Sequence, residues 1–309
     1  MDILITGGAG YIGTTLVPQL LALGHSVTVL DSLKFGGDAL MPFFRNPKFS
    51  FIKGDVRNSE LLRECVRKSD VVVHLAAIVG YPACAREPEL AQQVNVDATR
   101  ELSKMVSNEQ LVLFGSTGSN YGALVDGVCT EDSPLNPLSH YGATKTEAEK
   151  IIMNGTKAVA YRFATAFGVS PRLRLDLLIN DFVSKALNDK YIVVYESHFM
   201  RTFIHVHDIA RSFVFAIQNQ DKMVHNVYNV GNKRMNRSKG EICDLISSKV
   251  DYYLHKADYE ADADKRNYVV SYDKIGSQGF DTTVSIEQGI DELVNAMQAV
   301  NFTNRYKNV

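Results

Sequence analysis

A tyrosine and a lysine four residues apart are the clearest pointer to chemistry in this 309-residue chain. Tyr141 and Lys145 lie in the segment SHYGATK, which follows the proline-containing stretch SPLNPL. Residues i and i+4 of a helix are neighbours on one face. A nearby ammonium group stabilises a phenolate and lowers the pKa of tyrosine from about 10. The pair is therefore suited to take a proton from a substrate hydroxyl near neutral pH.

A glycine-rich segment, ITGGAGYIG, follows the first apolar run of the chain. Gly7, Gly10 and Gly13 are spaced GxxGxxG, and Gly8, Gly10 and Gly13 are also spaced GxGxxG. Such glycines allow a tight turn, close approach of the backbone to a pyrophosphate, and close packing of helix on strand. The sequence therefore predicts nucleotide phosphates at the N-terminus of the helix that follows.

Asp31 ends the second predicted strand, about 20 residues beyond this loop, where an acidic residue can bind the adenosine ribose hydroxyls. A carboxylate there repels a 2′-phosphate, so the sequence favours NAD over NADP. Asp55 ends the third predicted strand in KGDV, and HLAA at residues 74–77 ends the fourth. An adenine and a nicotinamide ribose would lie at these positions, and His74 itself is interpreted as a core residue.

A reaction of this kind also needs a hydroxyl that orients the substrate oxygen. The segment FGSTGSNYG offers Ser116, Thr117 and Ser119 at the end of the fifth predicted strand. A tyrosine and a lysine at this spacing are, on their own, often a chance solvent-facing pair. A dinucleotide loop and a hydroxyl-rich strand end favour the catalytic interpretation, and the residues alone leave the choice among the three hydroxyls open.

Composition argues against several classes of function. The 33 Lys and Arg residues nearly balance 35 Asp and Glu residues, and no block of like charge favours nucleic acid or a membrane surface. No apolar run approaches the roughly 20 residues that cross a bilayer, and a strand begins at residue 2 in place of a signal peptide, so we expect a cytoplasmic protein. The cysteines form no CxxC pair and are expected to be reduced and buried; they are Cys65, Cys84, Cys129 and Cys243.

Short β-branched runs alternate with amphipathic segments as far as about residue 168. Strands are predicted at 2–6, 26–31, 49–55, 70–76, 110–116 and 158–164. Near-continuous apolar strands separated by helices indicate a parallel sheet covered on both faces. We predict an α/β, Rossmann-like doubly wound sheet at residues 1–168, with a returning segment at about 205–230. A smaller α+β substrate lobe is predicted at 169–204 and 231–309, and its polar tail, NFTNRYKNV, is expected to fray.

In combination, these segments resemble the extended short-chain dehydrogenase/reductase family, specifically its NAD-dependent epimerases and dehydratases that act on nucleotide sugars. The resemblance spans nearly the whole chain through TGGAGYIG, GDVRN, QVNVDAT, YGATK, YRFATAFG, RTFIHVHDIA and YNVG. It implies that Thr117 hydrogen-bonds the reacting hydroxyl, that Tyr141 is the base, and that Lys145 grips the ribose. The NAD contacts that it implies, besides Tyr141 and Lys145, are Gly7, Gly10, Tyr11, Ile12, Gly13, Asp31, Asp55, Val56, Leu75, Ala76, Ala77 and Asn95.

The same resemblance implies that the smaller lobe binds the nucleotide diphosphate of the substrate. Arg201 and Arg266 match arginines that relatives direct at the pyrophosphate, whose oxygens suit a planar guanidinium. Asn180 matches an asparagine near the same phosphates, and Arg172 and Arg174 lie where the chain enters the lobe. For each arginine the alternative is a surface charge lying over apolar neighbours.

The segment HVHD has the appearance of a metal-binding pair, with His205 and His207 at alternate positions. Alternate positions of a strand more often share one packed or exposed face, so no metal site is predicted. Asp208 is predicted to cap the helix that follows it.

Departures from the family pattern bear on the reaction and on the substrate, among them a threonine in RTFIH where many relatives have aspartate. Nucleotide-sugar 4,6-dehydratases of this family have Asp-Glu after the threonine, and this chain has Gly118 and Ser119. Thr165 stands where a well-studied branch has asparagine, so the sugar and the base stay open. We expect an enzyme that oxidises a nucleotide-sugar hydroxyl at C4, as an epimerase or a 4-dehydrogenase. A dehydratase, a 4-keto reductase and a non-catalytic dinucleotide sensor are the alternatives.

The resemblance also implies an oligomer. Relatives pair the helix that carries the tyrosine and lysine, and the helix before it, across a two-fold axis. Here those helices are predicted in ELAQQVNVDATRELSKMV and SHYGATKTEAEKIIM. We therefore expect a homodimer, the commonest symmetric oligomer.

Overall fold

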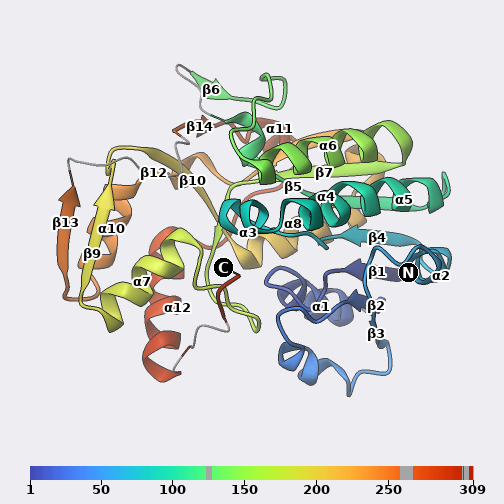
Figure 1. Cartoon of the computed structure of the whole chain (residues 1–309), viewed down its shortest axis with the longest axis horizontal. Helices are drawn as coiled ribbons and strands as arrows, with labels where there is room; N and C mark the ends of the chain where they lie inside the picture. The colour runs from blue at the N-terminus through green and yellow to red at the C-terminus, as the bar shows by residue number, and fades with distance from the viewer. Residues whose placement is uncertain (123–126, 258–266, 301, 303–305, 309) are drawn as a thin grey trace.

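The centre of the protein is a seven-stranded parallel sheet with strand order β11-β7-β5-β4-β1-β2-β3, seen in a computed structural model (Figure 1). The structure describes residues 1–122, 127–257, 267–300, 302 and 306–308. The strands are β1 (Asp2–Thr6), β2 (Ser26–Asp31), β3 (Phe49–Lys53), β4 (Val71–His74), β5 (Leu111–Thr117), β7 (Ala158–Phe163) and β11 (Asn226–Val230). The predicted Rossmann-like fold is confirmed. Because the strand order reverses between β1 and β4, a crevice opens at the carboxyl ends of these strands.

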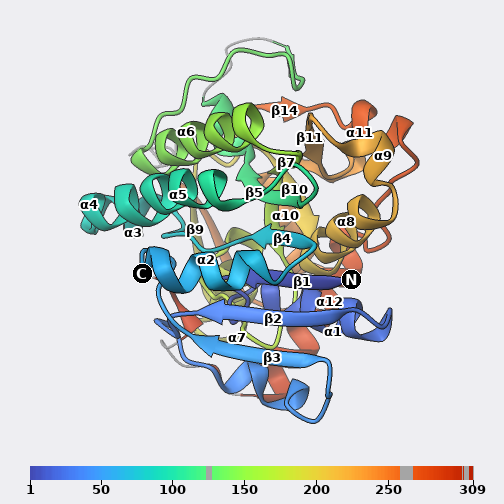
Figure 2. The ribbon, with the colours of Figure 1, turned by 90° about the vertical axis from the view of Figure 1, so that its right-hand side faces the viewer.

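Helices cover both faces of this sheet. On one face lie α2 (Ser59–Arg67), α5 (Ala98–Met105) and α6 (His140–Gly155), which form a row in Figure 2. Their apolar residues, among them Leu62, Leu102 and Ile152, pack on the side chains of one sheet face. On the other face, α1 (Gly13–Ala22) and α8 (Val206–Gln218) pack through residues such as Leu16 and Phe213.

A second, smaller core lies beyond the carboxyl ends of the strands. It holds a three-stranded sheet of β12 (Asn236–Ser238), β10 (Met200–His205) and β8 (Thr165–Phe167), and a two-stranded sheet of β13 (Tyr253–Ala257) and β9 (Tyr191–Tyr195). Three helices pack on these strands: α7 (Leu178–Asn188), α10 (Lys239–Ser247) and α12 (Ile286–Ala299). The segment that holds α8 and β11 returns from this lobe to the large sheet. The domain boundaries themselves stay a prediction.

Short elements connect these layers. The strands β6 (Val128–Cys129) and β14 (Val269–Val270) pair in parallel, apart from the large sheet. The remaining helical turns are η1 (Asp38–Phe43), α3 (Tyr81–Arg86), α4 (Pro88–Gln92), η2 (Gln93–Asp97), η3 (Gly118–Tyr121), α9 (Gln220–Met223), η4 (Lys233–Met235) and α11 (Asp273–Ser277). The helix expected as one piece in ELAQQVNVDATRELSKMV is thus divided into α4, the π-helical turn η2 and α5.

The prediction that Asp208 caps a helix is wrong. Helix α8 begins at Val206, and the ring of His205 accepts a hydrogen bond from the His207 N–H at 3.2 Å as its cap. His207 therefore lies in a helix and does not share a strand face with His205. Asp208 is fully buried in the first turn, where it binds backbone N–H groups of Thr283 and Val284.

The expectation that the C-terminal tail frays is wrong for the residues that the structure describes. The carbonyl of Tyr306 accepts a hydrogen bond from the Leu175 N–H at 2.9 Å, and Arg172 donates to Asn308 Oδ1 at 2.8 Å. The Asn308 N–H in turn donates to Asp176. Tyr306 and Asn308 are thus joined to residues 172–176 by backbone and side-chain hydrogen bonds.

All four cysteines are free and buried, as the sequence predicted. No helix in the described part of the chain is long and apolar enough to cross a membrane. Among the same residues, no group of three His, Cys, Asp or Glu side chains is placed to hold a metal ion.

Candidate active site

The glycine loop packs so closely against its neighbours that side chains would not fit. Gly7 has a φ of +72°, and a Cβ on it would lie 2.6 Å from the backbone nitrogen of Ala76. A Cβ on Gly13 would lie 2.5 Å from Gly8 Cα. Helix α1 begins directly after the loop, and no described side chain caps it or places a negative charge in its first turn. Such a helix end can receive an anion.

Asp31 is fixed beside this loop by the backbone. Its carboxylate accepts hydrogen bonds from the Ala9 N–H at 3.0 Å and from the Leu33 N–H at 2.7 Å. Burial raises the pKa of Asp31, and the two backbone donors oppose that effect. The acid that ends β2 is therefore held at the rim of the crevice.

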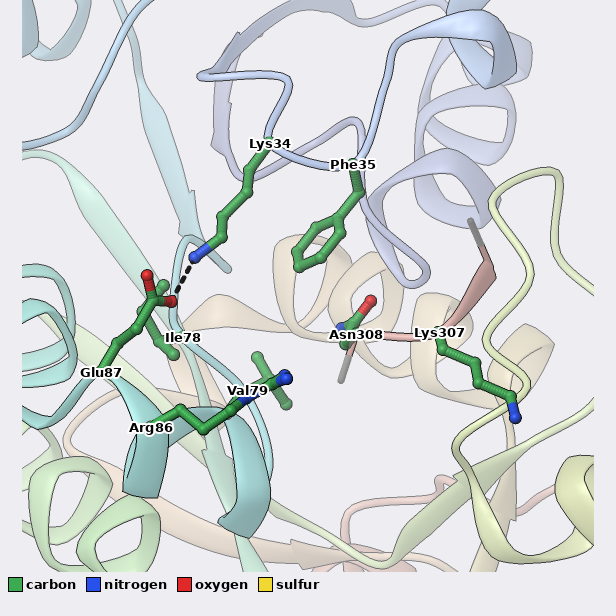
Figure 3. Close-up of a pocket in the computed structure, with 9 residues that line it drawn as sticks. Lys34, Phe35, Ile78, Val79, Arg86, Glu87, Lys307 and Asn308 are labelled. Atoms are coloured by element: carbon green, nitrogen blue, oxygen red, sulfur yellow. Dashed lines mark hydrogen bonds and ion pairs between the residues drawn. The ribbon is translucent and has the colours of Figure 1, made fainter. Parts of the chain in front are cut away.

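A cavity of about 240 Å³ lies where the segments after β2 and β4 face each other. Lys34 and Phe35 line it from the β2 side, and Ile78 from the β4 side. Figure 3 shows Lys34 reaching to Glu87, with which it forms an ion pair of 2.6 Å. The cavity thus occupies the crevice that the strand order predicts.

A second cavity of about 460 Å³ is lined by Asp55 and Val56 at the end of β3. Asp55 pairs with Arg57 at 2.7 Å, and Arg57 also donates to Gln93 Oε1 at 2.7 Å. The hydrogen bond from Arg57 lowers the pKa of Asp55. Asp55, expected beside an adenine, and Val56, an expected NAD contact, therefore line one cavity.

Asn95 joins the segment after β4 to helix α6 from below the crevice. Its Oδ1 accepts from the Ile78 N–H at 2.8 Å, and its Nδ2 donates to Thr144 Oγ1 at 3.1 Å. Leu75, Ala76 and Ala77 precede Ile78 in the same segment and are half-buried. One buried amide thus fixes this wall of the crevice to the helix that bears Tyr141.

His74 is a core residue, as interpreted from the sequence. It is 1% exposed, and its ring lies within hydrogen-bond distance of the Thr6 and Thr99 hydroxyls. Burial lowers its pKa to about 3. The ring is therefore neutral near physiological pH.

Helix α6 presents Tyr141 and Lys145 from its first two turns. Ser139 caps the helix by accepting a hydrogen bond from the Gly142 N–H at 3.1 Å. Lys145 is 3% exposed, and its ammonium lies 4.0 Å from the centre of the Phe114 ring. Burial lowers the pKa of Lys145 to about 7, and the charge of Glu149 opposes that effect. Tyr141 is half-buried.

The hydroxyl-rich end of β5 meets the first turn of α6. A Cβ on Gly142 would lie 3.1 Å from the Ser119 carbonyl, so the two segments touch. Thr117 caps η3, with its Oγ1 accepting from the Ser119 N–H at 3.1 Å and donating to Ser119 Oγ at 3.2 Å. Ser116 points elsewhere, because its hydroxyl donates to Glu149 at 2.6 Å. Of the three hydroxyls, Ser116 thus binds Glu149, whereas Thr117 and Ser119 bind each other.

The expected phosphate-binding residues do not share one place. Arg172 is buried, and its guanidinium lies 4.9 Å from the Phe35 ring, at the crevice. Arg174 pairs with Asp176, and Asn180 binds backbone atoms of Gly168 and Arg174.

The remaining expected contacts are spread more widely. Arg201 is 2% exposed on β10, and Thr165 is half-buried on β8. The Tyr11 hydroxyl is buried and donates to the Gly168 carbonyl at 2.8 Å, so it joins the two lobes. Arg266 lies outside the described residues.

Sequence reasoning missed two groups of residues beside the crevice. Lys307 and Asn308 line the first cavity from the tail, and nothing in their polar sequence signals that position. Glu149 lies one helical turn beyond Lys145 and binds the strand end next to Thr117. The repeated spacing of four residues in Tyr141, Lys145 and Glu149 could have indicated it.

Comparison with known proteins identifies the family. The model of the NAD dependent epimerase/dehydratase family matches residues 3–231. The low-salt glycan biosynthesis protein Agl12 of Haloferax volcanii is 29% identical over 308 residues, which cover 96% of this chain and 98% of that protein. The UDP-glucose 4-epimerase of Lactobacillus helveticus is 34% identical over 179 residues, 55% of this chain and 53% of its own.

Solved structures agree in fold. The crystal structure of DesIV, a dTDP-glucose 4,6-dehydratase from Streptomyces venezuelae with NAD and TYD bound, has a TM-score of 0.85 at 26% identity and covers 97% of each chain. MoeE5 in complex with UDP-glucose and NAD has a TM-score of 0.83 at 25% identity, over 97% of this chain and 99% of its own. Since the family model covers most of the sequence, the chain belongs to the NAD-dependent epimerase/dehydratase family.

Proposed function

We propose that this protein oxidises the C4 hydroxyl of a nucleotide sugar with NAD, as an epimerase or a 4-dehydrogenase. One observation carries the proposal. A buried ammonium, Lys145, lies one helical turn from Tyr141 on a helix whose first turn touches the Thr117 segment. A buried charge and a phenol beside a nucleotide crevice are what alcohol oxidation requires.

NAD fits the crevice on this chain's own geometry. Gly7 and Gly13 leave no room for a side chain, the N-terminus of α1 has no cap among the described residues, and Asp31 is fixed at the rim. The phosphates would lie at the helix end and the adenosine ribose at Asp31. When bound, NAD supplies the hydride acceptor for the sugar carbon and can return the hydride.

Three side chains would handle the proton and the oxygen. Thr117 orients the C4 hydroxyl through a hydrogen bond from Oγ1. Tyr141 as phenolate takes the hydroxyl proton while the hydride leaves C4, so that the C4 carbon and oxygen become a carbonyl. Lys145 stabilises the phenolate by its charge and binds the nicotinamide ribose.

The two positions after Thr117 argue against water loss. Gly118 has no side chain, and Ser119 offers a hydroxyl that is a poor acid and a poor base near neutral pH. Elimination across C5 and C6 needs both groups in place. We therefore favour epimerisation or net oxidation over dehydration, with the oxygen at C6 retained.

The substrate would enter from the smaller lobe. Arg172, which lies at the Phe35 side of the crevice, and the buried Arg201 are our candidates for the diphosphate, since guanidinium groups match phosphate oxygens. Thr165, Arg174, Asn180 and Arg266 are further candidates from the family resemblance. The relatives named above include proteins crystallised with UDP-glucose or named for UDP- and dTDP-glucose.

We also propose a cytoplasmic homodimer that pairs α5 and α6 across a two-fold axis. The two helices lie side by side on the outside of the sheet (Figure 2), and Arg100 and Glu147 join them at 2.8 Å. Sedimentation at micromolar concentration tests this, and a monomer would contradict it.

The experiment for the reaction is a measurement of product mass. The protein is incubated with NAD and with UDP-, GDP-, CDP- and dTDP-linked hexoses, and the sugar products are weighed. Unchanged mass with an inverted centre means epimerisation, and loss of two hydrogens means net oxidation. Loss of one water would contradict our interpretation of Gly118 and Ser119.

A further inference from the structure

A buried carboxylate lies on the catalytic helix one turn beyond Lys145. Glu149 is 3% exposed, and its Oε2 accepts from the Ser116 hydroxyl at 2.6 Å and from Asn120 Nδ2 at 3.1 Å. Its Oε1 accepts from Arg162 Nη2 at 2.7 Å. Arg162 on β7 is 6% exposed, so both charges are removed from water.

These hydrogen bonds connect the elements that bear the reacting groups. Ser116 directly precedes Thr117 on β5, and Asn120 belongs to the turn η3 that Thr117 caps. Arg162 lies opposite Ser116 in the sheet register. One side chain of α6 therefore fixes the position of Thr117 relative to the helix that holds Tyr141 and Lys145.

Arg162, the other member of this ion pair, also has several hydrogen-bond partners. Arg162 Nη1 donates to the Tyr121 hydroxyl and to the Glu131 carbonyl, both at 3.0 Å. The Tyr121 hydroxyl donates to Asn229 Oδ1 on β11 at 2.6 Å. Burial opposes the charge of Arg162, but the hydrogen bonds and charge of Glu149 outweigh it and raise its pKa. Glu149, the Tyr121 hydroxyl and the Glu131 carbonyl thus hold the Arg162 guanidinium from three sides.

The negative charge of Glu149 also acts on Lys145, where it favours the ammonium form. The titratable groups beside Lys145 are His74 from β4, Cys84 from α3, and Tyr141 and Glu149 from its own helix. His74 is neutral, and burial raises the pKa of the Cys84 thiol to about 11, so the thiol is also neutral. Besides the Tyr141 phenolate that the reaction requires, Glu149 is the group among these that brings a negative charge to Lys145.

We propose that Glu149, held by Arg162 and Ser116, is a positioning residue that aligns Thr117 with Tyr141 and keeps Lys145 in its ammonium form. The inference rests on the proposed function, because it assigns a task within that reaction. It differs from a purely structural ion pair in one respect: the charge of Glu149 affects the pH range over which the enzyme works.

The test is Glu149→Gln, which keeps the shape of the side chain and removes its charge. We expect kcat to fall by about 10- to 100-fold, the size of effect that a small misplacement of reacting groups produces. The variant also removes the negative charge that favours the Lys145 ammonium, so Lys145 loses its proton at lower pH. The alkaline limb of the kcat profile should therefore move down by about one pH unit.

Two companion variants separate position from charge. Glu149→Gln combined with Arg162→Met removes both charges, so kcat should stay low and the alkaline limb should stay where Glu149→Gln puts it, because the negative charge beside Lys145 is still absent. Ser116→Ala removes the 2.6 Å hydrogen bond without changing charge, so kcat should fall and the limb should stay in place. Ser116→Ala also serves if Glu149→Gln does not fold, and an unchanged kcat in it would overturn the proposal.

The matched control is Asp208→Asn, another buried carboxylate paired with an arginine, Arg211, at 2.7 Å. It should lose stability and keep the parent kcat and pH profile. If Glu149→Gln behaves like this control, with lower stability alone, Glu149 is structural and the proposal is overturned.

A second readout keeps the proposal separate from the reaction itself. Competitive acetylation with acetic anhydride over a range of pH, read by mass spectrometry on the peptide with Lys145, reports the pH at which this amine loses its proton. The midpoint should be lower in Glu149→Gln than in the parent, and equal midpoints would overturn the charge role. A parent without turnover would overturn the proposed function and leave this measurement valid.

Discussion

Lys145 and Asp208 are both buried charged residues, and they differ in how their charges are satisfied. Asp208 is fully buried and accepts hydrogen bonds from the Thr283 and Val284 N–H groups and the Thr283 hydroxyl, besides its ion pair with Arg211. Lys145 is 3% exposed, and it takes part in no hydrogen bond or ion pair between the described residues. Its ammonium rests on the Phe114 ring instead.

The difference separates a charge that stabilises the fold from one that is kept ready for chemistry. A buried ion whose hydrogen bonds are complete holds segments together, here α8 and residues 283–284 before α12. A buried ion without a hydrogen bond or an ion pair destabilises the fold, and strongly perturbed groups of this kind cluster at functional sites. In this protein the second kind, Lys145, lies on the helix that bears Tyr141, and the first, Asp208, joins α8 to the residues before α12.

The largest effect is expected from removing the charge of Lys145. Burial lowers its pKa from 10.5 to about 7, so the unfolded chain holds this proton more tightly than the folded protein. Lys145→Met should therefore raise the free energy of unfolding of the NAD-free protein by about 2–4 kcal/mol at pH 7 and below. Turnover should be lost in the same variant.

The stability that Lys145→Met gains over the parent should shrink as the pH rises from about 7 toward 10.5. Over this range Lys145 in the folded parent gives up its proton while the unfolded chain keeps it. Urea unfolding of parent and variant over this range measures the difference. A variant less stable than the parent at pH 7 would show that the favourable contacts of Lys145 outweigh the cost of burying its charge.

For Asp208, whose hydrogen bonds are complete, we expect the opposite: removing the charge should lower the free energy of unfolding. Asp208→Asn replaces an acceptor with a group that donates toward N–H groups already pointing at it, so the variant should lose about 3 kcal/mol of stability. Chemical denaturation measures this loss. Turnover per folded molecule should equal that of the parent, and a loss of turnover larger than the loss of folded protein would show that Asp208 also takes part in the reaction.

A smaller effect is expected at Asp31, which is fixed by two backbone N–H groups but faces the crevice. Asp31→Ala should weaken the binding of NAD by about 1.5–3 kcal/mol, the value of hydrogen bonds to a charged group. The variant should also narrow the difference in affinity between NAD and NADP. Titration calorimetry with both dinucleotides gives the two affinities. Equal affinities for NAD and NADP in the parent would refute the assignment.

The smallest effect is expected for an exposed pair. Lys185 and Asp181 form an ion pair of 2.7 Å on α7, with side-chain exposures of 45% and 26%. Lys185→Ala should change stability by no more than about 0.3–0.5 kcal/mol. Thermal unfolding at low and high salt checks this. A larger change would mean that burial does not decide how much an ion pair contributes to the stability of this protein.

Much of the fold follows from local patterns in the sequence. The apolar runs at β1, β2, β4 and β5 predict parallel strands because such strands are buried on both faces. The glycine loop and Asp31 are predictable for the same kind of reason, since chain geometry forces their types and spacing.

Other features depend on distant partners that no local pattern reveals. Asp208 has the composition of a helix cap, yet Thr283 and Val284 supply its hydrogen bonds from across the lobe. Tyr306 and Asn308 belong to a polar tail, and Leu175 and Arg172 nevertheless bind them. Glu149 is visible as a residue two turns after Tyr141, but its contacts with Ser116 and Arg162 arise only when β5 and β7 lie side by side.

The most direct test is rapid mixing of the protein and NAD with its nucleotide sugar, followed through the absorbance of reduced nicotinamide. We predict that reduced nicotinamide forms in the parent. In Tyr141→Phe it should form about 10²–10⁴-fold more slowly at unchanged NAD affinity, because the ring remains and the proton acceptor is lost. Equal rates in parent and variant would contradict the account, since Tyr141 would then take no part in oxidising the sugar.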